Sequence, residues 1–255
     1  MSRLRLLVAV AAFAGCSTAP LPPTGRGKEC NERCAQYLAA GNLQAAEDQC
    51  NLGIEFSPQF GDLWVNKGLI ALARGDQKSA KEFFIKALRL NNDQAQAHNN
   101  LGAIYLSERE FHKARDNFQH ALRVDPDYLE ARLNLGFAFK GLGERESARA
   151  AWRTLLHVRP TVAEAWGQLG AMDLEDGHTG DAIENLTKAV QLDPNFTEAW
   201  LSLGNAYMEV GRPCDARDSF AACLEVKEDK PECRNNIGIA DNACQLQQKA
   251  VEPRE

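Results

Sequence analysis

The sequence predicts an all-α protein, a right-handed superhelical solenoid of six helical hairpins followed by a C-terminal capping helix. Three observations predict it: a repetition every 34 residues, small and large side chains at fixed offsets, and glycine or proline where helices should end. Hydrophobic residues make up 44% and charged residues 25% of the 255 positions, which is typical of a folded protein.

The repetition is defined by positions that recur every 34 residues. The first position holds Trp64, His98, Arg132, Trp166 and Trp200. Four residues later stands a glycine: Gly68, Gly102, Gly136, Gly170 and Gly204. Further along come an alanine (Ala80, Ala114, Ala148, Ala182 and Ala216) and a large apolar residue (Phe84, Phe118, Trp152, Leu186 and Phe220). This is the tetratricopeptide (TPR) pattern, W-x₂-L-G-x₂-Y, then A-x₃-F, then P.

Each of these positions has a physical role in a helical hairpin. Small residues let two antiparallel helices approach closely, and we expect the large residue to fill the space between hairpins. Glycines that tolerate a positive φ separate the two helices in most repeats: Gly41, Gly75, Gly143, Gly177 and Gly211. Proline ends the second helix at Pro58, Pro126, Pro160 and Pro194.

The spacing places the solenoid at residues 29–249, with repeats at about 27–60, 61–94, 95–128, 129–162, 163–196 and 197–230. A capping helix is expected at 231–249, because the last repeat needs a cover for its apolar face, and 250–255 form a tail. The first repeat is degenerate. It has Cys30 in the Trp place, Cys34 in the glycine place and Cys50 in the large-residue place.

The N-terminus has the layout of a secretory signal. Arg3 and Arg5 precede an apolar run over residues 6–14, which is too short to span a bilayer, so residues 1–15 are expected to be a signal peptide. The run ends in Phe13-Ala14-Gly15-Cys16, which resembles the bacterial lipobox. That resemblance implies acylation at Cys16, and Ser17 favours the outer membrane over the inner one. Residues 16–28 then form a lipidated, flexible tether. The alternative is an ordinary signal peptide that ends at a chance cysteine.

The other seven cysteines predict disulfides, because a secreted chain is oxidised. For residues that face each other across an antiparallel hairpin, the two residue numbers add up to a nearly constant sum, the index sum. This rule pairs Cys34 with Cys50, Cys214 with Cys244, and Cys223 with Cys233, and it leaves Cys30 unpaired because Cys30–Cys50 fits less well. A metal site is not expected, because the cysteines lack the Cys-x₂-Cys spacing of such sites.

The first helices should line a concave groove that binds a protein segment. Two residues after the Trp position comes a polar ladder: Asn66, Asn100, Asn134 and Gln168, continued by Ser202 and Asn236. Amides of this kind can hydrogen-bond the backbone of a bound segment, or they can simply solvate the helix or join neighbouring repeats. An apolar strip is expected beside the ladder: Val65, Leu69, Leu133, Phe137 and Leu201. An amphipathic partner helix is one segment that such a groove would accept.

Other classes of function lack sequence support. No nucleophile–base, P-loop or dinucleotide motif is present, so neither an enzyme nor a cofactor or small-molecule substrate is expected. The net charge of −6 argues against a nucleic-acid partner.

The combination of a lipobox, a tether and six TPR hairpins resembles the outer-membrane lipoproteins of type IV pilus biogenesis, the pilotins of the secretin. The additional cysteines make it similar to the myxobacterial social-motility type. This resemblance implies a lipoprotein that faces the periplasm, binds secretin subunits and promotes their assembly for motility. The alternative function is a periplasmic TPR adaptor lipoprotein that recruits a protease or a cell-wall enzyme.

Overall fold

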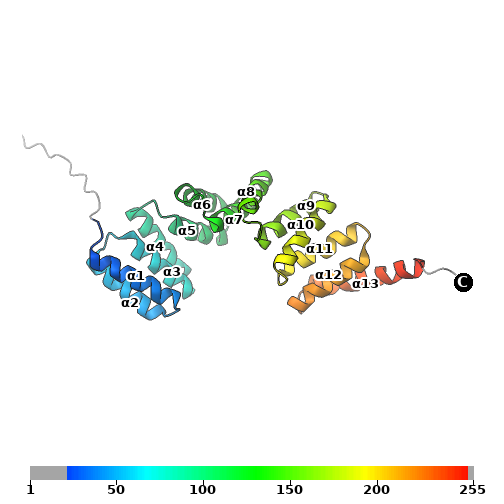
Figure 1. The fold of residues 1–255 in the computed structure, drawn as a ribbon, viewed down its shortest axis with the longest axis horizontal. Coiled ribbons are helices and arrows are strands. Elements are labelled where there is room, and N and C mark those ends of the chain that lie inside the picture. The colour runs from blue at the N-terminus through cyan, green and yellow to red at the C-terminus, as the bar shows by residue number, and fades with distance from the viewer. Residues whose placement is uncertain (1–21, 252–255) are drawn as a thin grey trace, which may run out of the picture. The chain divides into compact units, whose positions relative to one another are not determined.

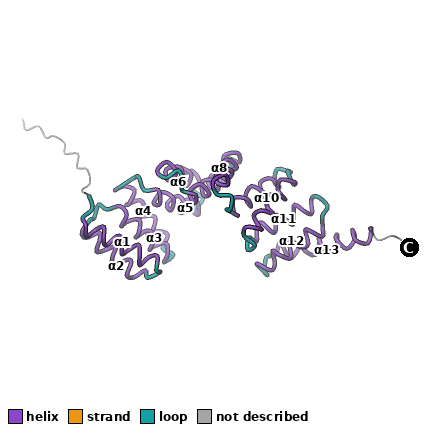
Figure 2. The backbone as a smooth tube through the Cα atoms, viewed as in Figure 1, coloured by secondary structure: helices purple, strands orange, loops and turns teal. Residues whose placement is uncertain are grey.

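The computed structural model describes residues 22–251, and within this range it contains thirteen helices and no strand (Figures 1 and 2). The all-α prediction is therefore confirmed. The chain divides into two compact units, Met1–Ala97 and His98–Glu255.

The first unit contains two antiparallel hairpins. Helix α1 (Gly25–Ala39) pairs with α2 (Leu43–Phe56), and α3 (Gly61–Ala73) pairs with α4 (Gln77–Leu90). Helix α3 packs against both α1 and α2, so the hairpins share a core that includes Leu63 and Ile70.

The second unit continues the same alternation. Its helices are α5 (Ala95–Ser107), which begins in the last residues of the first unit, α6 (Phe111–Val124), α7 (Leu129–Gly141), α8 (Arg145–Val158), α9 (Ala163–Glu175), α10 (Thr179–Leu192), α11 (Thr197–Glu209), α12 (Pro213–Val226) and α13 (Pro231–Val251). Four hairpins are formed by α5/α6, α7/α8, α9/α10 and α11/α12, and α13 packs on α12.

The repeat glycine faces the large residue of its own hairpin. A Cβ atom added to Gly68, Gly102, Gly136, Gly170 or Gly204 would lie 2.2–2.7 Å from Phe84, Phe118, Trp152, Leu186 or Phe220, respectively. Such an approach is far shorter than a van der Waals contact, so only glycine lets the two helices pack at this distance. The large residue therefore fills space within its hairpin, whereas the sequence suggested the space between hairpins.

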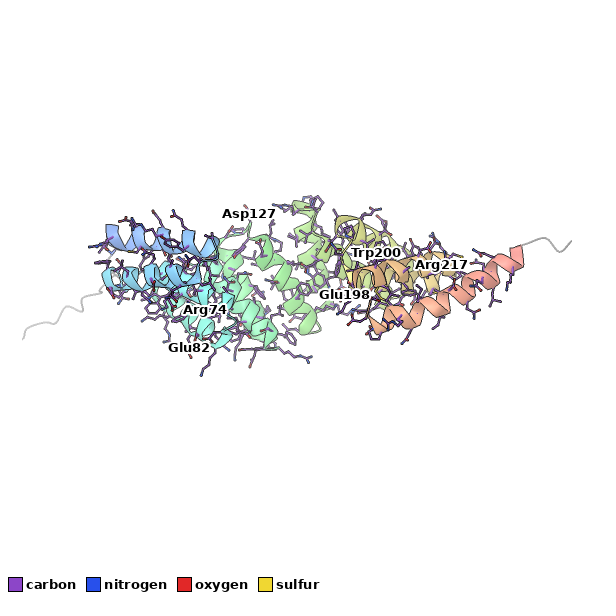
Figure 3. The ribbon with its side chains drawn as sticks, turned by 90° about the horizontal axis from the view of Figure 1, so that it is seen from below. Arg74, Glu82, Asp127, Glu198, Trp200 and Arg217 are labelled. Carbon is purple, nitrogen blue, oxygen red and sulfur yellow. A yellow bond between two sulfur atoms is a disulfide. The ribbon has the colours of Figure 1, made fainter. Side chains whose placement is uncertain are left out.

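The Trp position fixes the start of the first helix to the preceding loop. The indole N–H groups of Trp64, Trp166 and Trp200 donate to the carbonyl oxygens of Pro58, Pro160 and Pro194 at 3.1, 2.8 and 2.9 Å (Trp200 is labelled in Figure 3). Arg132 replaces the indole with a guanidinium that donates to the Pro126 carbonyl. Each of these prolines stands two residues after the end of a second helix, so the hydrogen bond ties one hairpin to the next.

The folded part begins earlier than the sequence predicts. The flexible tether was expected to reach residue 28, but α1 already starts at Gly25. The reason is local: the Thr24 hydroxyl oxygen accepts a hydrogen bond from the Gly27 backbone N–H at 3.0 Å, and the Thr24 N–H donates to the Ser57 hydroxyl at 2.9 Å. The predicted signal peptide and the predicted lipidation site Cys16 lie outside the described residues.

Three disulfides join cysteines of adjacent helices. They link Cys34 to Cys50, Cys214 to Cys244, and Cys223 to Cys233, with Cα–Cα distances of 5.4, 4.8 and 6.3 Å. These are the same pairs that the index sums indicate, and Cys30 is a buried free thiol. None of the described helices combines the length and apolar character that crossing a membrane requires.

Candidate protein-binding groove

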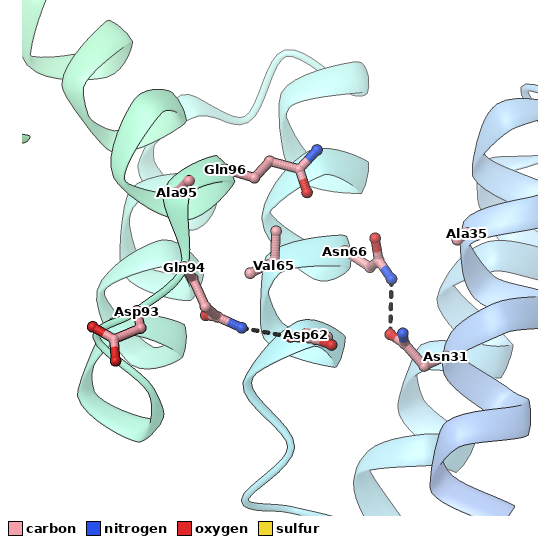
Figure 4. Close-up of a pocket in the computed structure, with 9 residues that line it drawn as sticks. All are labelled: Asn31, Ala35, Asp62, Val65, Asn66, Asp93, Gln94, Ala95 and Gln96. Atoms are coloured by element: carbon pink, nitrogen blue, oxygen red, sulfur yellow. Dashed lines mark hydrogen bonds between the residues drawn. The ribbon is translucent and has the colours of Figure 1, made fainter. Parts of the chain in front are cut away.

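A polar cavity of about 420 Å³ opens on the first unit (Figure 4). Helix α1 contributes Asn31 and Ala35, and α3 contributes Asp62, Val65 and Asn66. The remaining wall is formed by residues 93–96, the last two of which begin α5. Two of the residues predicted to line a groove, Val65 and Asn66, thus lie in this cavity.

The lining of this cavity is acidic and rich in amides. It includes two carboxylates (Asp62 and Asp93), four amides (Asn31, Asn66, Gln94 and Gln96) and three apolar side chains (Ala35, Val65 and Ala95). None of these nine described residues is basic. A chain bound here would meet hydrogen-bonding groups and negative charge together.

Two hydrogen bonds hold the amides in place. Asn66 Nδ2 donates to Asn31 Oδ1 at 2.9 Å, and Gln94 Nε2 donates to Asp62 Oδ1 at 2.6 Å (Figure 4). Gln94 is only 9% exposed, and its buried Oε1 accepts no hydrogen bond from the described residues. Gly61 makes room for this side chain, because an added Cβ would lie 2.9 Å from Gln94 Nε2.

The predicted asparagine ladder joins neighbouring repeats. Besides Asn66, Asn134 Nδ2 donates to Asn99 Oδ1 at 3.3 Å, and Asn236 Nδ2 donates to Asn205 Oδ1 at 3.0 Å. Of the two alternatives for the ladder, the inter-repeat contact is therefore present at three positions. An amide that makes one such bond still has other donors and acceptors for a bound backbone.

The remaining three predicted ladder positions, Asn100, Gln168 and Ser202, are only partly buried. Gln168 lies on α9, where its Oε1 accepts a hydrogen bond from Lys140 Nζ at 2.8 Å. Asn100 lies half-buried on α5.

The predicted apolar strip belongs in large part to the core. Val65 is 5% exposed, and Leu69 is half-buried. Phe137 packs edge-on against Trp152, with ring centroids 5.5 Å apart, and Leu133 packs against the same buried cluster. Leu201 packs against the cluster that contains Phe220. Val65 is therefore buried, whereas the other four side chains are partly exposed and pack against the core with only part of their surface.

A smaller cavity of about 180 Å³ lies in the second unit, beside α7 and α8. Its lining contains one charge of each sign, from Glu130 and Arg159, and four apolar side chains: Leu129, Leu133, Leu155 and Val162. Of the predicted strip residues in the second unit, Leu133 lines this cavity, whereas Phe137 and Leu201 line neither of the cavities described in that unit.

Two features escaped the sequence interpretation. The first is the wall formed by Asp62, Asp93 and Gln94, because Asp93 and Gln94 lie in the connection before α5, outside the positions that define the repeat. The second is a set of exposed apolar residues at the last position of the second helices: Val124, Val158, Leu192 and Val226. They are 37–56% exposed and recur every 34 residues, so the repeat alignment contained the signal.

The strongest electrostatic feature is a buried ion pair in the second unit. Arg149 on α8 is 5% exposed and binds Asp173 on α9, and it also binds Asp176 at 2.6 Å. Burial disfavours its charged form, but these hydrogen bonds outweigh that effect and raise the pKa of Arg149 above its usual value. The same arginine, followed by Arg145, lowers the pKa of Asp176. This network stabilises the packing of helices and involves none of the predicted groove residues.

No cluster of three His, Cys, Asp or Glu side chains that could hold a metal ion occurs within residues 22–251. The linings of the two cavities offer hydrogen-bonding groups, charge and apolar surface.

Family models of the tetratricopeptide repeat match residues 61–94, 95–128, 130–161 and 197–230, and a TPR repeat model matches residues 170–211. Together these matches cover more than half of the chain. No curated protein sequence matches it significantly.

Solved structures show the same fold at low sequence identity. PilF of Pseudomonas aeruginosa is 15% identical, and the match covers 82% of this chain and 96% of PilF with a TM-score of 0.74. PilW, described as a widely conserved type IV pilus biogenesis factor, is 19% identical over 83% of this chain and 98% of its own, with a TM-score of 0.70. YrrB, described as a TPR protein with an unusual peptide-binding site, is 19% identical over 73% and 96%, with a TM-score of 0.60.

Proposed function

Because this chain belongs to the tetratricopeptide-repeat proteins, whose repeats bind protein partners, we propose that it is a lipid-anchored scaffold acting as a pilotin. In this role it binds secretin subunits and promotes their assembly in the outer membrane for type IV pili. The lipid on Cys16 holds it at the membrane, and the folded part faces the periplasm.

The observation that carries the proposal is the order of parts along the chain. A lipobox-like Phe13-Ala14-Gly15-Cys16 precedes TPR hairpins that extend to residue 230. PilW, a type IV pilus biogenesis factor, shares the fold over 98% of its length. An acylated N-terminus would anchor such a scaffold firmly, since each buried CH₂ contributes about 0.8 kcal/mol.

The three disulfides support an oxidising compartment, because such bonds persist outside the cytosol. They join helices of the first hairpin and the last helix pair, and they leave the cavity of the first unit open. A periplasmic location is consistent with both features.

The test is deletion of the gene, followed by a blot for the heat-resistant secretin multimer. The multimer should disappear, and a plasmid copy of the wild-type gene should restore it. A Cys16→Ser copy should fail to restore it, because the unlipidated protein leaves the membrane. Normal multimer in the deletion strain would refute the pilotin function and favour the adaptor lipoprotein that recruits a protease or cell-wall enzyme.

The cavity of the first unit can be tested in the same strain. Replacing Asn31 and Asn66 together by alanine removes a hydrogen-bonded pair without leaving one partner alone, so the fold should persist. Co-purification of the secretin should then fall. The matched control replaces Asn205 and Asn236, an equivalent amide pair in the second unit. Equal loss in both variants would place the interface elsewhere.

A further inference from the structure

We propose that the cavity of the first unit accepts a lysine or arginine side chain from an extended segment of the partner protein. This inference rests on the proposed protein-binding function but does not depend on the partner being a secretin. It assigns the carboxylates Asp62 and Asp93, rather than an apolar strip, as the groups that select the partner.

Charge is the first argument. The cavity contains two carboxylates and no basic residue among its nine described lining residues. Lys67, which follows the lining residue Asn66, is paired with another acid, because its Nζ lies 3.7 Å from Glu47. A concave surface lined by one sign of charge focuses the field and attracts the opposite charge.

Shape and polarity are the second argument. Val65 and the two alanines offer an apolar surface for the aliphatic stem of a long basic side chain, while the carboxylates meet its charged end. The amides of Asn31 and Asn66 hold each other in place and retain hydrogen-bonding capacity for the backbone of the bound segment. Such a lining fits an extended chain with one basic residue better than an apolar helix.

Gln94 provides a third, independent argument. Its side chain forms part of the cavity wall and is only 9% exposed, and its Nε2 donates to Asp62 Oδ1 at 2.6 Å. This orientation directs the acceptor Oε1 away from Asp62, and no described residue donates to that oxygen. The hydrogen bond from Gln94 therefore holds the Asp62 carboxylate in a fixed position at the cavity before a cationic side chain binds.

The acidic character also recurs along the sequence. The repeat position of Asp62 holds carboxylates in three later repeats, Glu130, Glu164 and Glu198, and the capping helix has Glu232 at the equivalent place. In the second unit, Glu130 lines the smaller cavity, whereas Glu198 already binds Lys230 at 2.9 Å, which lowers the pKa of Glu198 (Figure 3). In the cavity of the first unit, the carboxylate at this repeat position, Asp62, lies beside a second carboxylate, Asp93.

The experiment titrates the ¹⁵N-labelled protein, with its disulfides formed, against four capped alanine–glycine decapeptides. They differ only in a central lysine, arginine, glutamine or glutamate. The lysine and arginine peptides should shift the side-chain amide signals of Asn31, Asn66 and Gln94. The other two peptides should require about tenfold higher concentration. Raising the salt from about 50 mM to about 500 mM should weaken the binding, since exposed charge pairs are screened.

A double variant tests the assigned residues. Asp62→Asn with Asp93→Asn keeps the side-chain size and an acceptor for Gln94. It should lower the affinity for the lysine peptide by about three- to tenfold, the range expected for exposed ion pairs. The matched control, Asp48→Asn with Glu55→Gln on α2, removes the same charge away from the cavity and should bind as the wild type does.

The possible outcomes separate this inference from the pilotin function. Equal binding of the glutamate peptide, no binding of any peptide, or undiminished binding by the Asp62/Asp93 variant would each overturn the inference. None of these results affects the secretin blot of the deletion strain. Conversely, a normal multimer in that strain refutes the pilotin function and leaves the preference for basic peptides standing.

Discussion

Arg109 occupies the turn position at which the other hairpins with a left-handed turn have glycine. Its φ is 61°, and the corresponding glycines have φ between 71° and 78°. A residue with a Cβ pays a steric cost in this conformation, so Arg109→Gly should stabilise the protein by about 1 kcal/mol. Urea unfolding followed by circular dichroism measures the change.

The reverse substitution provides the control for Arg109. Gly143 has a φ of 75°, and an added Cβ would meet no atom within 4 Å. Gly143→Ala should therefore destabilise the protein by a similar amount through backbone strain alone. Unchanged stability in both variants would show that these turns relax at no cost.

His120 makes the stability depend on pH near neutrality. Its ring stacks on His98 with centroids 4.8 Å apart, and burial, then the nearby Arg123 and His98, lower the pKa of His120 below its usual value of 6.5. The unfolded chain therefore takes up a proton at higher pH than the folded one. This contribution to stability is complete above about pH 6.5 and is lost as the pH falls through the lower folded value.

The prediction for His120 is that the free energy of unfolding decreases between about pH 7 and pH 5. His120→Phe keeps an aromatic ring on His98 but cannot be protonated, so this part of the decrease should vanish. An NMR titration of the His120 ring gives the folded pKa directly. A midpoint above 6.5 would contradict the prediction.

At the scale of elements, the Arg149 network joins three helices of two hairpins. Arg149 on α8 binds Asp173 on α9, and Asn185 on α10 donates to the other oxygen of Asp173 at 2.7 Å. Arg149→Met should destabilise the protein by about 3–5 kcal/mol, because it leaves a buried carboxylate without its cation. The exposed neighbour Arg145 is the control, and Arg145→Met should have a far smaller effect.

Chemical denaturation of both arginine variants measures this difference. If Arg149→Met were as mild as Arg145→Met, the carboxylate of Asp173 would have to be hydrated or protonated in the variant. Recovery of stability in Arg149→Met with Asp173→Leu would confirm that the lone buried charge causes the loss.

The first hairpin has a disulfide where the other hairpins have a glycine packed against a large side chain. Cys34 stands in the glycine place and Cys50 in the large-residue place, and both are fully buried. Removing the bridge with two alanines should cost about 3 kcal/mol. Cys34→Gly with Cys50→Phe should recover part of this loss, because it restores the pair that fills the other hairpins.

Thermal unfolding under oxidising conditions should therefore rank the wild type first, the Gly/Phe variant second and the Ala/Ala variant third. Under reducing conditions the Gly/Phe variant should be at least as stable as the wild type. A Gly/Phe variant less stable than Ala/Ala would show that the first hairpin has a different helix spacing.

These elements also show what the sequence can and cannot predict. The register of the repeat predicts the hairpins, the left-handed turns at Gly75 and Gly143, and the pairs that the disulfides join, since each depends only on positions along the chain. Exposure of Phe137 or Leu201 depends instead on how closely the neighbouring helices cover it. The start of α1 depends on a contact of Thr24 with Ser57, which is distant in sequence.

The cavity of the first unit illustrates the same limit. Its amide Asn66 follows the repeat, but Gln94 stands at a position where the other repeats mostly carry large apolar residues, and it fits because residue 61 is glycine. Gln94 departs from the repeat pattern, and its position beside Asp62 and Asp93 becomes visible only in the folded structure.

At the scale of the whole molecule, the disulfides lie in the first and last helix pairs that the structure describes. They connect α1 with α2 and α12 with α13, and none of the described helices between them carries one. In a repeat protein each hairpin is stabilised by its neighbours, so terminal units open first. The bridges therefore stabilise the units that have a neighbour on one side only.

Hydrogen exchange can test this distribution of stability. Reduction of the three disulfides should speed amide exchange in α1 and α2 by roughly a hundredfold, the factor expected from losing one bridge that contributes about 3 kcal/mol. The acceleration should be larger in α12 and α13, which share two bridges. Exchange in α7 and α8 should change little, because nearest-neighbour contacts hold them. A Cys30→Ala variant excludes disulfide exchange with the free thiol. A uniform acceleration in all helices would instead mean that the chain opens as one cooperative unit, and protection of its ends would then depend on every hairpin.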